Sequence, residues 1–98
     1  MLRNKLIYVS GPYTNGDVAS NVRNAALAGI EIMAIGASPY IPHLSHFIHY
    51  LMPHSYETWM EVDLAIIIKC DALLRLSGHS PGGDREVTHA KNLGLPVF

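Results

Sequence analysis

The chain has 98 residues, of which 49% are hydrophobic, and a formal net charge of −1. This length fits one domain, residues 1–98, and the hydrophobic share excludes a disordered chain. A charge so close to zero gives no electrostatic reason to expect nucleic acid or a membrane surface as a partner. So short a chain leaves apolar surface uncovered, which favours a homo-oligomer, a dimer or larger.

Cysteine content and the first residues both favour the cytoplasm. Cys70 is the one cysteine, so no internal disulfide can form, as is usual in a reducing compartment. Residues 1–5 run directly into a strand-like segment and lack the apolar region of a signal peptide. The longest apolar run, residues 64–68, is too short to span a bilayer. We therefore expect a cytoplasmic protein with no membrane segment.

Strand-like and helix-like patterns alternate along the chain. The expected elements are a strand at 6–9, a helix at 18–35, a strand at 38–41, a loop with a short helix at 43–54, a helix at 55–69, a strand at 71–76, a loop at 77–83, a helix at 84–92 and a last strand at 96–98. Gly36 and Gly94 are the expected helix stops. This order predicts an α/β fold with a parallel sheet of about four strands and helices on both faces. Ligands of such sheets bind beyond the carboxyl ends of the strands, where the loops at 10–14 and 77–83 lie.

The segment from Ser80 to Glu86 reads Ser-Pro-Gly-Gly-Asp-Arg-Glu. Gly82 and Gly83 would let the backbone approach a ligand, while the helix amides and the Ser80 hydroxyl would favour an anion. Glu86 lies about one turn into the helix and could point at the same pocket. In the purely structural interpretation, the glycines make a turn and Glu86 complements the helix dipole. The segment matches neither a P-loop nor GxGxxG, and we expect no cofactor.

Asp63 is an acidic residue in an otherwise apolar helix, where it shares a stripe with Trp59 and Ile67. A carboxylate on an apolar face is costly unless it is paired. Asp63 therefore either reaches solvent at the edge of the stripe, or holds a substrate or donates a proton.

Ser10-Gly11-Pro12-Tyr13 follows the first strand. Tyr13 could stack on a base or hydrogen-bond a catalytic carboxylate, or it could simply pack within the loop.

Four histidines lie close together in the sequence. His43, His46 and His49 are spaced by three residues and His54 follows. Two histidines at this spacing on a helix can share a zinc ion, but no cysteine or carboxylate pattern completes a recognised site. We therefore expect no metal and interpret these residues as histidines of a loop or a site lining.

In order and spacing, these segments resemble the nucleoside 2-deoxyribosyltransferase superfamily, which includes the nucleoside 5′-monophosphate N-glycosidases. The resemblance covers nearly the whole chain. It rests on residues 8–13 (Tyr-Val-Ser-Gly-Pro-Tyr), Asp63, 70–74 (Cys-Asp-Ala-Leu-Leu), 82–86 (Gly-Gly-Asp-Arg-Glu), Ala90 and 95–97 (Leu-Pro-Val). It implies a flavodoxin-like or Rossmann-like, doubly wound sheet.

The resemblance also implies roles for individual residues. Glu86 would attack C1′ of the sugar, expel the base and form a glycosyl ester, which water or a second base resolves. Tyr13 would orient this nucleophile, and Asp63 would hold the substrate or protonate the departing base. The substrate-binding residues would be Ser10, Gly11, Pro12, Ser80, Gly82 and Gly83.

Ser80 refines the expected substrate. The transferase branch tends to carry an acidic residue here, which meets a free 5′-hydroxyl, whereas the monophosphate branch carries serine. A carboxylate would repel a phosphate, so Ser80 favours hydrolysis of a nucleoside 5′-monophosphate over base exchange. Asp84 and Arg85 depart from the family pattern, and they could bind a different substrate or pair with each other outside the pocket.

Two other functions fit the same residues. One is a non-catalytic module that uses the pocket to sense or sequester a nucleotide. The other is a phosphoribohydrolase with a Pro-Gly-Gly loop and a glutamate, against which the absence of threonine after Gly83 argues.

Overall fold

The three strands form a parallel sheet in the order β2-β1-β3. The computed structural model describes all 98 residues and places β1 at Leu6–Ser10, β2 at Ser38–Tyr40 and β3 at Ala72–Arg75. In the register of the sheet, Tyr8 of β1 lies opposite Tyr40 of β2 and Leu73 of β3. Because β1 is paired along both edges and covered on both faces, it is the most buried segment of the chain.

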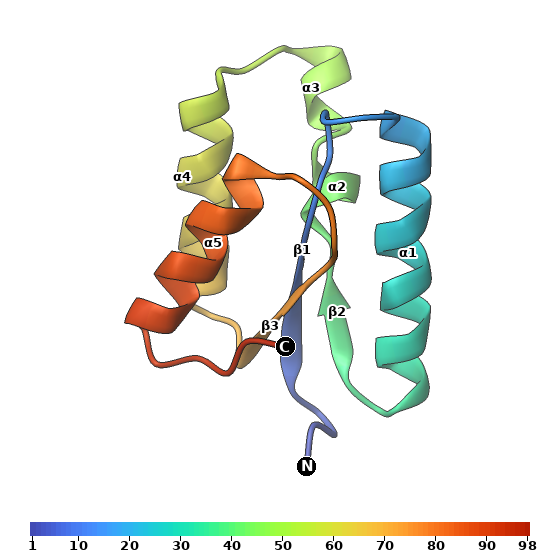
Figure 1. The fold of residues 1–98 in the computed structure, drawn as a ribbon, viewed down its shortest axis with the longest axis vertical. Coiled ribbons are helices and arrows are strands. Elements are labelled where there is room, and N and C mark those ends of the chain that lie inside the picture. The colour runs from blue at the N-terminus through green and yellow to red at the C-terminus, as the bar shows by residue number, and fades with distance from the viewer.

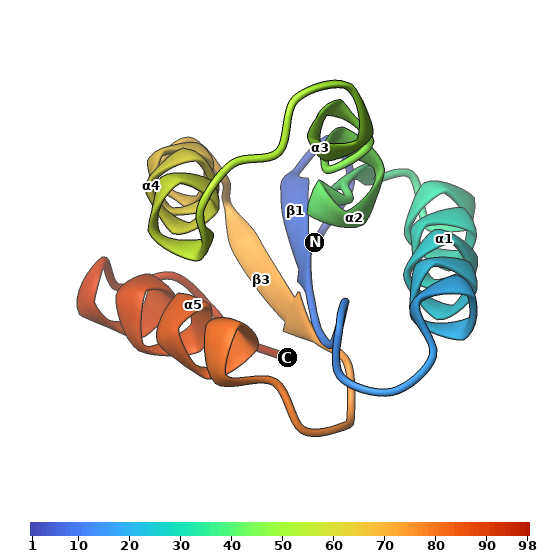
Figure 2. The ribbon, with the colours of Figure 1, turned by 90° about the horizontal axis from the view of Figure 1, so that it is seen from above.

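Helices cover both faces of this sheet, so the predicted α/β class is confirmed (Figure 1). One face is covered by α1 (Val18–Ala34), and the other by α4 (Tyr56–Ile67) and α5 (Pro81–Asn92). The two short helices α2 (Pro42–Ser45) and α3 (Ile48–Leu51) lie near the carboxyl ends of the strands (Figure 2). None of the helices is long and apolar enough to cross a membrane.

The side chains of β1 alternate between two separate cores. Ile7 and Val9 pack against α1, whereas Tyr8 packs with residues of α4, α5 and β3. This alternation is the period of two that any strand imposes on its side chains. It follows that Tyr8 and Ser10 both face the side of the sheet on which α5 lies.

Three details differ from the sequence prediction. The expected fourth strand at 96–98 is reduced to an isolated parallel bridge between Val97 and Leu73, because only a few backbone hydrogen bonds link the chain end to β3. The last helix begins at Pro81 rather than at 84, because Ser80 caps it and proline suits its first turn. The region expected to hold one short helix holds two, α2 and α3.

Glycines end α1 and α5 in the same way. Gly36 and Gly94 have φ angles of 85° and 78°, in the left-handed region that favours glycine. After each helix, a backbone N–H reaches back across the last turn: Ala37 donates to Ile32, and Leu95 donates to Ala90. Both stops agree with the sequence prediction.

Gly94 allows a clean test of this backbone constraint, because a β-carbon added there would meet nothing within 4 Å. Changing Gly94→Ala should lower the free energy of unfolding by about 1 kcal/mol through left-handed strain alone. Gly94→Asn should cost less, because asparagine tolerates this conformation. Urea denaturation of the two variants measures the difference, and an alanine variant as stable as wild type would contradict this account.

Candidate active site

Glu86 is a buried carboxylate that joins α5 to the central strand. It lies on the face of α5 that packs on the sheet and is 6% exposed. The Tyr8 hydroxyl donates a 2.7 Å hydrogen bond to Oε2, and the Ser10 hydroxyl donates one of 2.7 Å to Oε1. Each carboxylate oxygen therefore has a donor, and the strand fixes the orientation of the group.

Burial dominates the electrostatics of Glu86. It raises the pKa of the carboxyl from 4.5 to about 7, because a charged form is poorly solvated there. The hydrogen bonds from Tyr8 and Ser10 act in the opposite direction and favour the carboxylate, whereas nearby Asp63 raises the pKa further. Burial and the Glu86 charge together raise the pKa of Tyr8, so this hydroxyl stays a donor. Glu86 can thus exchange between acid and carboxylate near neutral pH.

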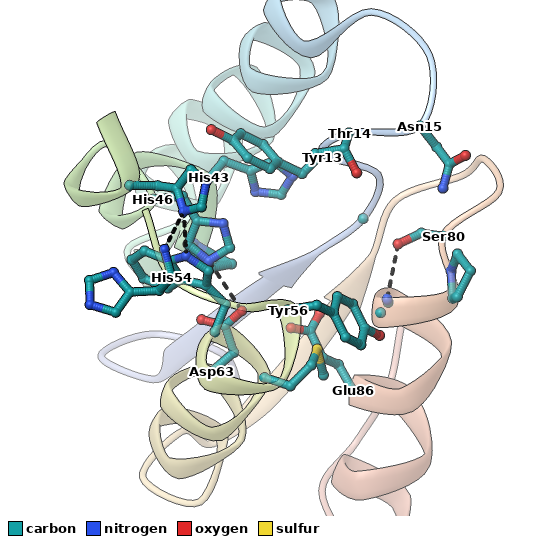
Figure 3. Close-up of a pocket in the computed structure, with 18 residues that line it drawn as sticks. Tyr13, Thr14, Asn15, His43, His46, His54, Tyr56, Asp63, Ser80 and Glu86 are labelled. Carbon is teal, nitrogen blue, oxygen red and sulfur yellow. Dashed lines mark hydrogen bonds and ion pairs between the residues drawn. The ribbon is translucent and has the colours of Figure 1, made fainter. Parts of the chain in front are cut away.

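Glu86 lies at a cavity of about 390 Å³ (Figure 3). Its volume is in the range of pockets that hold small molecules. Its walls come from the loop after β1, from α2 to α4 and from the start of α5. The lining residues are Gly11, Tyr13, Thr14, Asn15, Pro42, His43, His46, His49, His54, Tyr56, Trp59, Met60, Asp63, Ser80, Pro81, Gly82, Gly83 and Glu86.

The start of α5 forms one wall of the cavity. The Ser80 side chain caps the helix by accepting a 2.9 Å hydrogen bond from the Gly83 amide. Glycine at 83 avoids a tight contact, because an added β-carbon would lie only 3.0 Å from Arg75 Nε and from the Ser80 hydroxyl oxygen. The presence of glycine at 83 thus has a structural explanation beside the expected close approach to a ligand.

Arg75 holds the loop between β3 and α5 in place. Its guanidinium donates hydrogen bonds to the carbonyls of Leu76 and Gly78, and it contacts Asp84 at 3.1 Å. The loop that presents Ser80 is therefore fixed from behind by a cation that does not line the cavity.

Histidines form the opposite wall. His43 Nε2 is 2.9 Å from the Pro12 carbonyl oxygen, and His49 Nδ1 accepts 3.0 Å hydrogen bonds from the Trp59 indole and the His54 amide. Burial lowers the pKa of His43. No group of three or more His, Cys, Asp or Glu side chains is placed to hold a metal ion.

Asp63 does not reach solvent, because it is 3% exposed and lies against His46. The closest atoms of the two side chains, His46 Nε2 and Asp63 Oδ2, are 3.3 Å apart. The His46 ring also packs on Trp59 and Tyr13, with centroids 4.2 and 5.2 Å away.

The structure brings most of the expected site residues to the cavity. Asp63, Glu86, Tyr13, Gly11, Ser80, Gly82 and Gly83 line it. Ser10 and Pro12 do not line it. Ser10 donates a hydrogen bond to Glu86, and the Pro12 carbonyl oxygen contacts His43 Nε2. Tyr13 makes edge contacts with His43 and His46, and the tyrosine hydroxyl on Glu86 is that of Tyr8.

Asp84 and Arg85 do not pair with each other. Asp84 pairs with Arg75, and Arg85 pairs with Glu57 at 2.9 Å. Both lie on a shallow outer surface rather than in the cavity.

The sequence interpretation missed Tyr8, Trp59 and Arg75. The period of two along the first strand was the available signal for Tyr8, since it puts residues 8 and 10 on one face. Arg75 has no comparable signal, because its contacts depend on how the following loop folds back.

The sheet and its covering helices define an α/β protein with the fold of the 2-deoxyribosyltransferases. A 2-deoxyribosyltransferase from the psychrotolerant bacterium Bacillus psychrosaccharolyticus superposes with a TM-score of 0.71 at 20% identity, over 94% of this chain and 69% of that one. A 2-deoxyribosyltransferase from Leishmania mexicana gives 0.71 at 21% identity, over 96% of this chain and 62% of that one. The chain thus spans less than two thirds of the Leishmania protein.

By sequence, the chain belongs to the family described as "Domain of unknown function (DUF7768)", whose profile matches residues 5–98. No curated protein matches it in sequence.

Titration of Glu86 should make stability depend on pH. Its pKa of about 7 in the folded chain exceeds the ordinary 4.5, so the stabilisation it contributes is complete below about pH 4.5 and is lost as the pH rises through 7. Glu86→Gln removes this titration. The variant should therefore gain stability relative to wild type between pH 5 and 8, by about 1–3 kcal/mol.

Thermal melts of both proteins across this pH range measure the difference. Glu61→Gln, at an exposed position of α4, is the matched control and should show a difference that does not change with pH. If the stability difference between Glu86→Gln and wild type also stays constant with pH, Glu86 titrates in the folded chain as it does in water.

Proposed function

We propose that this chain cleaves the N-glycosidic bond of a nucleoside 5′-monophosphate, or of a nucleoside, through a covalent glycosyl ester on Glu86. The observation that carries the proposal is the carboxylate itself, buried at a small-molecule cavity with a hydroxyl donor on each oxygen. The two structural neighbours named as 2-deoxyribosyltransferases support it, since the fold is shared along nearly the whole chain.

The proposed reaction has two displacements at C1′ of the sugar. In the first, a Glu86 oxygen forms a bond to C1′ while the bond to the base breaks, and its electron pair leaves with the base. In the second, water or another base attacks C1′ and releases the carboxylate. Covalent capture divides one difficult displacement into two easier ones, as in a retaining glycosidase.

We assign the orienting role to Tyr8 rather than to Tyr13. Tyr8 and Ser10 hold both oxygens of Glu86, so the carboxylate presents a fixed edge to the substrate. These hydrogen bonds also favour the charged form, which is the nucleophile. Tyr13, with its edge contacts to two histidines, would instead form part of the wall around the base.

The start of α5 is the proposed place of the 5′-phosphate. Amides at a helix start bind anions, and the cap at Ser80 is neutral. No lysine or arginine lines the cavity, and the Gly83 amide is taken by the Ser80 cap, so binding of the phosphate would depend on the Gly82 amide and on hydroxyls. This arrangement favours monophosphate hydrolysis over base exchange with a nucleoside.

The remaining parts of the proposal concern the whole protein. Residues 1–98 would act as one domain, because the cavity draws on segments from Gly11 to Glu86. We place it in the cytoplasm, where its unpaired Cys70 stays reduced. A homo-oligomer would cover apolar side chains that α1 and α3 leave exposed, among them Ile30, Met33, Ile48 and Leu51.

Replacing the nucleophile tests the proposed reaction. Glu86→Ala and Glu86→Gln should lower the rate of base release from deoxynucleoside monophosphates by about 10³-fold or more, because no group remains to capture C1′. Chromatography of free base, with a panel of nucleosides and monophosphates, gives the measurement. Addition of a second base separates transfer from hydrolysis.

Glu61→Gln should keep full activity, and circular dichroism should show that the Glu86 variants are folded. Unchanged turnover in Glu86→Ala would refute the role of Glu86. Stabilisation of wild type by monophosphates without any base release would instead favour a non-catalytic nucleotide-binding module.

Ser80→Asp tests the phosphate site without removing the helix cap, since aspartate caps a helix as well as serine does. Its negative charge should raise KM for a monophosphate by about 10-fold or more through repulsion, and should leave KM for the free nucleoside within a few-fold. Ser80→Asn is the matched neutral cap and should change KM for either substrate by no more than a few-fold. If Ser80→Asp changes KM equally for the monophosphate and the free nucleoside, the 5′-group does not bind at the start of α5.

A further inference from the structure

His46 connects a buried carboxylate to the cavity. Its Nε2 atom is 3.3 Å from Asp63 Oδ2, and the two side chains are 14% and 4% exposed. Figure 3 shows this contact as a dashed line between α4 and the histidine wall. Both residues line the cavity together with Glu86. Of the pair, the imidazole is the more accessible group.

The two ring nitrogens of His46 have different surroundings. Neither nitrogen makes a hydrogen bond within the protein, but Nε2 is fully buried and lies 3.3 Å from Asp63 Oδ2, whereas Nδ1 is not fully buried. A carboxylate beside one ring nitrogen favours a proton on that nitrogen. Nδ1 is then the nitrogen left to exchange a proton with a bound molecule.

Neighbouring histidines are less suited to this exchange. A ring nitrogen of His43 is engaged by the Pro12 carbonyl, and Nδ1 of His49 accepts two N–H groups. Only His46 contacts a carboxylate. Its ring is also held between Trp59 and Tyr13, which limits its rotation.

We propose that His46 is the proton donor to the departing base, with Asp63 as the carboxylate that orients its ring. This inference rests on the proposed function. The resemblance to the 2-deoxyribosyltransferases implies that Asp63 holds the substrate or itself protonates the base. The contacts instead favour a relay, in which Asp63 acts through the imidazole.

Protons and electrons balance in both displacements. As Glu86 bonds to C1′ and the C1′–N bond breaks, the electron pair goes to the base and the Nδ1 proton of His46 is transferred to a base nitrogen. In the second displacement, water bonds to C1′, the ester bond returns its electron pair to Glu86, and the proton from water goes to Nδ1. His46 is thus acid and then base, as a glycosidase acid–base residue is.

The leaving group distinguishes this role from a purely structural one. Adenine leaves deoxyadenosine monophosphate more easily when it is protonated, whereas 7-methylguanine is already cationic in its nucleotide and leaves neutral without a proton. We therefore compare His46→Gln and His46→Ala with wild type on the 5′-monophosphates of deoxyadenosine and 7-methyldeoxyguanosine, measuring release of free base in a single turnover, which reports the first displacement alone.

Both variants should lose about 100-fold or more in the single-turnover rate of base release from the adenine substrate, and no more than a few-fold in that rate on the 7-methylguanine substrate. Added imidazole should restore part of the adenine activity of His46→Ala. Glu86→Gln should lose both activities, because the nucleophile serves either substrate. His89→Gln, at a half-buried position of α5 that does not line the cavity, is the matched control and should lose neither.

Equal losses on the two substrates, without rescue by imidazole, would overturn the role of His46 while leaving Glu86 in place. Full activity of His46→Gln on the adenine substrate would also overturn it. Failure of wild type to release base from either substrate would overturn the proposed function, and this inference with it.

Discussion

The burial of one carboxylate between β1 and α5 is the constraint on which the site depends. Glu86 stays usable as an anion because Tyr8 and Ser10 donate to its two oxygens, and they can do so because alternate residues of a strand share one face. Burial raises its pKa to about 7, so ionisation costs stability at the pH at which the anion is useful. This is the compromise expected of the nucleophile that we propose Glu86 to be.

The cavity above Glu86 has two chemically different walls. One is the capped start of α5, which offers the Gly82 amide, the Ser80 hydroxyl and no positively charged side chain. The other combines four histidines, Trp59 and Asp63 from α2, α3 and α4 and the loops between them. A ligand with an anionic end and an aromatic, proton-accepting end fits both walls, as a nucleotide does. The walls therefore support the proposed reaction independently of the resemblance.

Local patterns predicted the fold well, because each rests on short-range chemistry. Alternating strands and helices imply a parallel sheet with helices on both faces, and glycines mark the ends of α1 and α5. The errors lie where pairing or capping decides the outcome. Residues 96–98 form only a bridge to β3, and Ser80 starts α5 three residues earlier than expected.

The sequence by itself determined the fold class, the place of the site beyond the strands, and Glu86, Asp63 and Ser80 as candidates, because spacing and residue type are local properties. Only the tertiary structure decided which tyrosine meets Glu86, since Tyr8 and Glu86 are 78 residues apart and meet through packing. It likewise decided that Asp63 faces His46 and that Asp84 and Arg85 face away from the cavity. Contacts between distant segments depend on how the layers stack, which no short sequence pattern encodes.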